Sequence, residues 1–204
     1  MTKIKICGLS RKCDIEAANA LLPDYIGFVF FRKSKRYVSF EQAKELKAVL
    51  NTAIKAVGVF VDESIENIVT LLDHCVIDIV QLHGNEDEDY IKELRSFTDK
   101  PIIKAFCINN EDDIVKANNS TADYILLDSG KGSGNVFDWG LITKIKRPYF
   151  LAGGLSADIA EKAIEILNPF ALDVSSGVEK NGLKDKNKMA AFVDAIRKDE
   201  KYDE

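Results

Sequence analysis

The sequence has few of the features that mark secreted, membrane-spanning or disordered proteins. Only four of its 204 residues are cysteines, which is too few to indicate a disulfide scaffold in a chain of this length. No run approaches the roughly 18 consecutive apolar residues of a transmembrane helix. The opening segment Met1–Gly8 holds too few apolar side chains for a signal peptide. We therefore expect a cytoplasmic protein with no membrane partner.

A strong excess of charge of one sign is also lacking. The 28 Lys and Arg residues and the 33 Asp and Glu residues give a net charge of −5. This mild acidity argues against a nucleic-acid partner, which would require a basic face. The apolar fraction of 46% and the charged fraction of 30% are ordinary for a globular protein and exclude a disordered chain. No linker rich in proline, glycine or serine divides the chain.

Short apolar runs alternate along the chain with segments of helical periodicity. Eight of these runs mostly lack a polar face, which is typical of strands buried on both sides in a parallel sheet. The runs are Ile4–Cys7, Tyr25–Phe30, Ile54–Val61, Ile77–Leu82, Ile102–Phe106, Tyr124–Leu127, Tyr149–Ala152 and Phe170–Val174. A segment with helical spacing follows each run, and the sixth includes Leu141, Ile142 and Ile145. The Ser39–Gln42 segment matches a helix capping box.

Eight such units predict a (β/α)8 barrel, the TIM barrel fold. They share 204 residues, about 25 each, which is near the lower limit for this architecture. A doubly wound open sheet has the same alternation and is the alternative. The count of eight, and the absence of a GxGxxG motif after the first run, favour the barrel. We therefore expect residues 1–204 to form a single α/β domain.

In a (β/α)8 barrel the functional residues follow the strands, at their carboxyl ends. Gly153 and Gly154 follow the seventh run, and Ser175 and Ser176 follow the eighth. Glycine lets backbone N–H groups approach an anion closely, and the loops after strands seven and eight often hold phosphate in this fold. Each segment alone is also typical of an ordinary turn. The two together favour a phosphate site.

Two titratable residues flank this predicted phosphate site in the ring order of the strands. Cys7 ends the first run and Asp128 follows the sixth. A thiol and a carboxyl group on opposite sides of a ligand suit paired acid–base catalysis, provided that nearby donors or positive charge lower the pKa of the thiol. The alternatives are a small buried hydrophobic residue for Cys7, and a helix cap or ion pair for Asp128.

Other candidates are indicated by position alone. Arg36 lies in a basic loop after the second run, where its planar guanidinium suits a carboxylate or a phosphate. His83 follows the fourth run, and either faces the mouth of the barrel or caps a turn. The glycine-rich segment Ser129–Gly134 follows Asp128, and is either a surface loop or a lid over the mouth.

The remaining cysteines give no indication of a metal site. Cys13, Cys75 and Cys107 have no spacing to a pair of histidines that would suggest zinc. We expect these three residues to pack in the interior, and we expect no metal ion.

Several segments spread over almost the whole chain form a recognisable pattern. They are Lys5–Leu9, Gly27–Phe30, Ser34–Ser39, Val57–Phe60, Gln81–Gly84, Asp138–Trp139, Leu151–Leu155 and Asp173–Glu179. Each segment is unspecific alone, but all of them in this order are specific. Between Lys5 and Ile196 the chain resembles the phosphoribosylanthranilate isomerase family.

The resemblance implies an Amadori rearrangement in tryptophan biosynthesis, which converts N-(5′-phosphoribosyl)anthranilate into 1-(2-carboxyphenylamino)-1-deoxyribulose 5-phosphate. Cys7 matches the family's general base, which removes the C2′ proton, and Asp128 matches its general acid, which protonates the ring oxygen. Arg36 matches the residue that faces the anthranilate carboxylate. The other matches are Gly154, Ser175 and Ser176 at the phosphate, and Asp173 and His83 near the substrate. The resemblance implies a phosphosugar substrate and no metal or organic cofactor.

The chain departs from the family pattern in two loops, and rival readings exist. Lys35 stands where the family often has proline, and Gly130–Asn135 carries its lysine at a displaced position. The analogous isomerase of histidine biosynthesis uses two aspartates at strand ends and usually shows two similar half-barrels, whereas this chain has Cys7 and no such halves. A non-catalytic phosphosugar-binding regulator would not need the paired Cys7 and Asp128. The sequence leaves the oligomeric state open.

Overall fold

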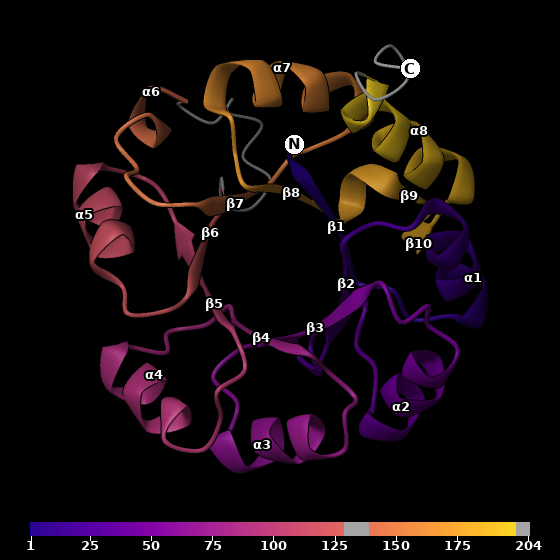
Figure 1. The fold of residues 1–204 in the computed structure, drawn as a ribbon, viewed down its shortest axis with the longest axis horizontal. Coiled ribbons are helices and arrows are strands. Elements are labelled where there is room, and N and C mark those ends of the chain that lie inside the picture. Colours follow the sequence, from indigo (N-terminus) through magenta and orange to yellow (C-terminus); the bar gives the residue numbers. More distant parts are fainter. Residues whose placement is uncertain (129–138, 199–204) are drawn as a thin grey trace.

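The eight apolar runs form the parallel strands of one closed barrel, which confirms the predicted (β/α)8 fold (Figure 1). The computed structural model describes residues 1–128 and 139–198. The barrel strands are β1 (Lys3–Cys7), β2 (Tyr25–Val29), β3 (Lys55–Phe60), β4 (Ile79–Leu82), β5 (Ile102–Cys107), β6 (Tyr124–Asp128), β7 (Tyr149–Ala152) and β8 (Ala171–Val174). Pairing of β1 with β8, which sets Lys5 opposite Asp173, closes the ring and excludes an open doubly wound sheet.

A helix follows each barrel strand and lies outside the ring (Figure 1). The helices are α1 (Lys12–Leu21), α2 (Phe40–Ala48), α3 (Ile65–Asp73), α4 (Glu88–Arg95), α5 (Glu111–Asn119), α6 (Trp139–Ile142), α7 (Ala157–Leu167) and α8 (Lys186–Ile196). Helix α6 ends before Ile145, which the helical spacing had placed in it. Between β8 and α8 the chain adds a 3-10 turn (Ser176–Val178) and a hairpin of β9 (Glu179–Lys180) and β10 (Leu183–Lys184), which the sequence did not predict.

Side chains at the helix starts explain where several helices begin. Ser39 Oγ accepts a hydrogen bond from the backbone N–H of Gln42 at the start of α2, as the capping-box pattern predicts. Asp87 caps α4 in the same way, accepting from the N–H of Tyr90 at 2.9 Å. Such a cap typically stabilises a helix by about 1 kcal/mol. These caps fix the points at which the loops after the barrel strands enter the helices.

The apolar side chains form two clusters, one on each side of the barrel wall, because strand residues alternate between the two faces. The larger cluster packs the helices against the outer face of the strands. The smaller fills the inside, where Phe150 is fully buried and its ring lies 5.4 Å from that of Tyr25 and 5.8 Å from that of Tyr124. Tyr25 and Tyr124 begin their strands, so this layer fills the amino-terminal half of the barrel. Inside the barrel, space for a cavity is therefore left toward the carboxyl ends of the strands.

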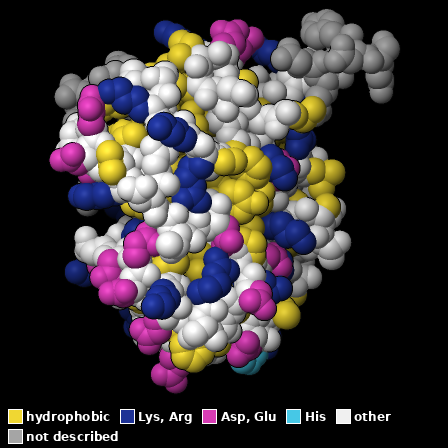
Figure 2. Space-filling view, turned by 60° about the vertical axis from the view of Figure 1, so that its left-hand side comes forward, with side chains coloured by type: hydrophobic (Ala, Val, Ile, Leu, Met, Phe, Trp, Pro, Cys, Tyr) yellow, Lys and Arg dark blue, Asp and Glu magenta, His cyan; other side chains and the backbone are white. Residues whose placement is uncertain are grey.

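The outer surface carries charges of both signs. In the face shown in Figure 2, acidic and basic side chains are interspersed with apolar ones. This mixture agrees with the small net charge of −5. Among the described residues, no helix combines the length and the apolar character needed to cross a membrane.

Candidate active site

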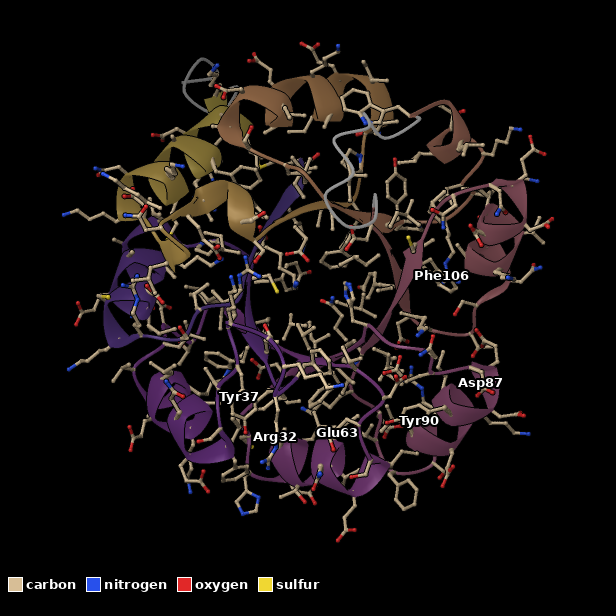
Figure 3. All side chains as sticks on the ribbon, turned by 180° about the vertical axis from the view of Figure 1, so that it is seen from behind. Arg32, Tyr37, Glu63, Asp87, Tyr90 and Phe106 are labelled. Carbon is tan, nitrogen blue, oxygen red and sulfur yellow. The ribbon has the colours of Figure 1, made fainter. Side chains whose placement is uncertain are left out.

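One cavity of about 410 Å3 opens at the carboxyl ends of the barrel strands. All nine residues predicted from the sequence line it, namely Cys7, Arg36, His83, Asp128, Gly153, Gly154, Asp173, Ser175 and Ser176. Side chains from around the ring converge on its centre in Figure 3, whereas the labelled Arg32, Tyr37 and Glu63 lie outside that centre, near α2 and α3. Those three residues line a second cavity of about 420 Å3. The predicted site is thus a single place in the molecule.

Cys7 ends β1 with its side chain in the cavity wall and only 9% exposed. Gly27 pairs with it on β2 and provides the space for the thiol, since a Cβ atom at Gly27 would lie 2.7 Å from Cys7 Sγ. Burial raises the pKa of the Cys7 thiol, and the ammonium group of Lys5 opposes that rise. The thiolate, which is the form able to accept a proton, therefore depends on the positive charge beside it.

A buried ion pair lies next to this thiol. Lys5 Nζ donates to Asp173 Oδ2 at 2.7 Å, and the two side chains are 0% and 7% exposed. Burial raises the pKa of Asp173, and the charge of Lys5 opposes the rise. The other carboxyl oxygen, Oδ1, is buried and has no hydrogen-bond partner among the described residues. Because an unpartnered buried acceptor is unfavourable by about 1–3 kcal/mol, Asp173 offers a position for a donor group of a ligand.

Asp128 ends β6 and lies beside His83, which directly follows β4. Its side chain is 30% exposed, and its Oδ2 lies 3.4 Å from His83 Nε2. The His83 ring in turn contacts the amide of Gln81, whose Nε2 lies 2.9 Å from His83 Nδ1. In ring order β7 and β8 separate Asp128 from Cys7. The carboxyl group and the thiol therefore flank the two loops predicted to bind phosphate.

The guanidinium group of Arg36 is bound by a carboxylate of this chain. Its Nε and Nη2 donate to the two carboxyl oxygens of Glu179 at 2.6 and 2.8 Å. Lys184 Nζ donates to the same carboxylate at 2.6 Å. Burial alone would raise the pKa of Glu179, but the hydrogen bonds and charges of Arg36 and Lys184 outweigh it and lower that pKa. The guanidinium predicted to face a ligand carboxylate is thus bound by Glu179, a pairing that the sequence did not predict.

The loops after β7 and β8 differ in what they offer an anion. Gly153 and Gly154 have φ angles of 89° and 63°, in the left-handed region that favours glycine, and a Cβ at Gly154 would meet no atom within 4 Å. The Gly154 backbone therefore borders open space. Ser175 Oγ donates to the carbonyl oxygen of Cys7 at 3.0 Å, so its hydroxyl proton is already used. Backbone N–H groups and Ser176 are then the available donors of this cradle.

Four residues that hold the site together had no role assigned from the sequence, namely Lys5, Gln81, Glu179 and Lys184. Two of them carried a local signal, because residues two apart on a strand share a face. Lys5 stands two residues before Cys7, and Gln81 two before His83. The pairing of Glu179 with Arg36 has no local signal in the sequence, because 143 residues separate the two.

The other cysteines lie where the prediction did not place them. Cys13, Cys75 and Cys107 are exposed, whereas Cys7 is buried. In α1 the inward positions are taken by Asp14, Ile15 and Ala18, so Cys13 is left on the outer face. No group of three or more metal-ligating side chains occurs within residues 1–128 and 139–198. The predicted lid, Ser129–Gly134, lies outside the described residues.

Comparison with known proteins gives a family model and relatives that all carry the same name. Residues 4–195 match the family model described as N-(5′phosphoribosyl)anthranilate (PRA) isomerase. The chain is 45% identical over 202 residues to the N-(5′-phosphoribosyl)anthranilate isomerase of Endomicrobium trichonymphae, with 97% of this chain and 99% of that protein covered. It is 46% identical over 200 residues to the protein of the same name from Clostridium kluyveri, with 97% and 98% covered.

Solved structures agree with these matches. The crystal structure of phosphoribosyl anthranilate isomerase from Thermotoga maritima has a TM-score of 0.88 and 36% identity, and covers 97% of this chain and 100% of that one. A structure of a phosphoribosyl anthranilate isomerase in complex with reduced 1-(o-carboxyphenylamino)-1-deoxyribulose 5-phosphate has a TM-score of 0.87, 36% identity and the coverage of 97% and 100%. The similarity spans the whole barrel rather than a part of it.

Proposed function

The chain belongs to the N-(5′-phosphoribosyl)anthranilate isomerase family and is an isomerase of tryptophan biosynthesis, and from this premise we propose that Cys7 is its general base and Asp128 its general acid. The reaction turns an aminoaldose into an aminoketose, so a sugar ring must open and a proton must leave C2′. One observation carries the proposal. A thiol from β1 and a carboxyl group from β6 line the same cavity, on either side of the loops after β7 and β8.

Asp128 acts first, by giving its proton to the furanose ring oxygen. The bond between C1′ and that oxygen breaks, and the lone pair of the anthranilate nitrogen forms a double bond to C1′. Such proton transfer by a positioned side chain contributes about 10²–10⁴-fold in rate. Asp128 is suited to the step because it lines the cavity with its side chain 30% exposed, within reach of a bound ligand.

Cys7 acts second, by taking the proton from C2′ as a thiolate. The electron pair of that bond forms a C1′–C2′ double bond and neutralises the iminium nitrogen. The resulting enolamine gains a proton at C1′ and loses one from the C2′ hydroxyl, which yields the ketone with all atoms conserved. Lys5 supports this step, because its ammonium charge opposes the rise that burial causes in the pKa of the Cys7 thiol.

The remaining cavity residues bind the substrate. We assign the phosphate to the backbone N–H groups of Gly153, Gly154, Ser175 and Ser176 and to the Ser176 hydroxyl, since the Ser175 hydroxyl donates to the Cys7 carbonyl oxygen. A related isomerase is solved with a reduced phosphosugar of this kind, and we extend that ligand class to this cavity. A phosphate on the loops after β7 and β8 directs the sugar carbons to the space between β6 and β1.

Arg36, His83 and Asp173 complete the binding site. Arg36 offers its guanidinium to the anthranilate carboxylate, shared with Glu179. Asp173 accepts a hydrogen bond from a substrate hydroxyl or amine through its unpartnered Oδ1, and His83 holds Asp128 at the substrate. The absence of a cofactor, of a nucleic-acid partner and of a membrane partner, and the cytoplasmic location, stay predictions from the sequence.

The proposal is tested by following phosphoribosylanthranilate fluorescence during turnover. We expect the wild type to turn over the substrate, and Cys7→Ala and Asp128→Asn each to lose about 10²-fold or more in kcat while still binding the reduced product analogue. In the same assay Arg36→Ala is expected to raise KM more than it lowers kcat.

Matched substitutions outside the cavity serve as controls. Cys107→Ala removes an exposed thiol from the carboxyl end of β5, and Asp112→Asn removes an exposed carboxylate from α5. Both are expected to keep the wild-type kcat. A wild type without turnover contradicts the function, and normal turnover by Cys7→Ala or Asp128→Asn contradicts the assigned roles.

A further inference from the structure

We propose that Gln81 is a positioning residue that fixes on which nitrogen His83 carries its proton, and that His83 thereby donates to Asp128 instead of competing for its proton. The inference rests on the proposed function for the role of Asp128. The side chains involved are a buried amide, an imidazole and a carboxyl group, and they form a continuous chain from β4 to β6.

The relay begins with two residues on one face of the β4 segment. Gln81 lies in β4 and is 1% exposed, and His83 follows the strand two residues later with its side chain 35% exposed. The backbone N–H of His83 continues the sheet by donating to the carbonyl oxygen of Phe60 at 2.8 Å. Both side chains therefore enter the barrel from a rigid piece of backbone.

The identity of the contacting atoms decides the tautomer. Gln81 Nε2, 2.9 Å from His83 Nδ1, is an amide nitrogen and can only donate. His83 Nδ1 must then be the accepting, unprotonated nitrogen of a neutral ring, and the ring proton sits on Nε2. Nε2 lies 3.4 Å from Asp128 Oδ2, which is the distance of an ion pair and not of a short hydrogen bond. The ring therefore presents a proton, and not a lone pair, to Asp128.

This arrangement matters for a general acid. An imidazole lone pair ordinarily binds a proton more tightly than a carboxylate does, so an unprotonated Nε2 beside Asp128 would take the proton meant for the ring oxygen. A donating Nε2–H removes that competing acceptor and holds Oδ2 in place. Gln81 does this without touching the substrate's reacting atoms, which makes it a positioning residue and not a catalytic one.

The chain contains its own reference for a measurement. Its sequence has two histidines, and the second, His74, is exposed at the end of α3. His74 Nδ1 lies 2.8 Å from the carbonyl oxygen of Thr70, which can only accept, so that ring carries its proton on Nδ1. The two rings are therefore expected to be opposite tautomers, which nitrogen NMR of the 15N-histidine-labelled enzyme distinguishes directly.

The experiment records both imidazoles at about pH 8, where ordinary histidine is neutral. We expect the proton on Nε2 in His83 and on Nδ1 in His74. Gln81→Glu replaces the donor by an acceptor of the same size and is expected to move a proton onto His83 Nδ1. Gln81→Met removes the partner and is expected to give a mixture of tautomers. Both variants are expected to lose about 10-fold or more in kcat, with a smaller change in KM.

Asn187→Asp, which replaces an exposed amide at the start of α8 by a carboxylate, is the matched control and is expected to leave both rings and kcat unchanged. A wild-type His83 that carries its proton on Nδ1, or on both nitrogens, overturns the inference. So does a Gln81 variant whose tautomer changes while kcat does not. The wild-type tautomer is read without turnover, so a wild type with the Nε2 proton but no activity contradicts the proposed function and supports the Gln81 assignment.

Discussion

At the scale of single residues, Cys7 meets two opposing requirements. Burial keeps water from a reacting thiol, but the same burial raises its pKa and disfavours the thiolate. Lys5 and Lys184 act in the other direction, and Asp173 adds a negative charge that again disfavours the thiolate. The basicity of Cys7 therefore depends on how the charge of Lys5 is divided between the thiol and Asp173.

A pH dependence follows from the direction of this shift. The pKa of Cys7 is raised above the ordinary value of 9.0, so the active thiolate is the minor form at neutral pH. We expect the thiolate fraction of Cys7 to rise with pH across the range from about 6 to 9, because each step toward the pKa removes protons from the thiol. The measurement is the ultraviolet thiolate absorbance against pH, taken as the difference between the wild type and Cys7→Ala, with Cys107→Ala as the matched variant that should keep the difference. A Cys7 thiolate that is already fully formed at pH 6 contradicts this account of the thiol.

At the scale of elements, the β9–β10 hairpin joins three loops of the site. Glu179 and Lys184 pair across the hairpin, and Glu179 binds Arg36 from the loop after β2. Lys184 Nζ donates to the carbonyl oxygen of Ser175. The backbone carbonyl oxygen of Lys184 accepts a hydrogen bond from the side chain of Arg11, at the start of α1. The hairpin thus fixes the position of Arg36 relative to the loop after β8. Disruption of the hairpin would therefore also disturb the site.

Substitution of Glu179 tests this element by its effect on stability. The Lys184 side chain is only 2% exposed, so Glu179→Gln leaves a buried ammonium group without its counter-ion. We expect the free energy of unfolding to fall by roughly 3 kcal/mol, measured by urea denaturation, and the added change Lys184→Met to restore part of it. The matched control is Glu161→Gln, whose pair with Lys198 is 59% exposed at both ends and is expected to change stability by less than about 1 kcal/mol. Equal small losses in both variants contradict the role of the hairpin.

At the scale of the whole molecule, ring closure is what makes a site from distant segments. Residues near the start of the chain meet residues near its end because β1 pairs with β8, and this pairing places Lys5 against Asp173. The apolar layer around Phe150 fills the amino-terminal half of the barrel, and the polar groups lie at the carboxyl ends of the strands. One end of the barrel therefore supplies stability and the other supplies chemistry.

The fold and the members of the site could be predicted because both depend on local pattern. Strand periodicity indicated the barrel, and position after a strand indicated residues such as Cys7 and Asp128. The side-chain pairings within the site could not be predicted in the same way. The pairing of Arg36 with Glu179 joins residues 143 apart, and the contact of Gln81 with His83 depends on which amide atom faces the ring. The first pairing is set by tertiary packing of distant segments, and the second by the orientation of one amide, which a spacing of two residues does not encode.

The central claim is that Cys7 takes the hydrogen from C2′, and it is tested most directly with substrate carrying deuterium at C2′. A serine hydroxyl is a much weaker base than a thiolate, so in Cys7→Ser the breaking of the C2′–H bond becomes the slowest step. We expect the primary isotope effect on kcat to be larger in Cys7→Ser than in the wild type. In Asp128→Asn, where ring opening becomes slow, we expect it to be no larger than in the wild type. An isotope effect that is unchanged in Cys7→Ser, or raised only in Asp128→Asn, would contradict the account.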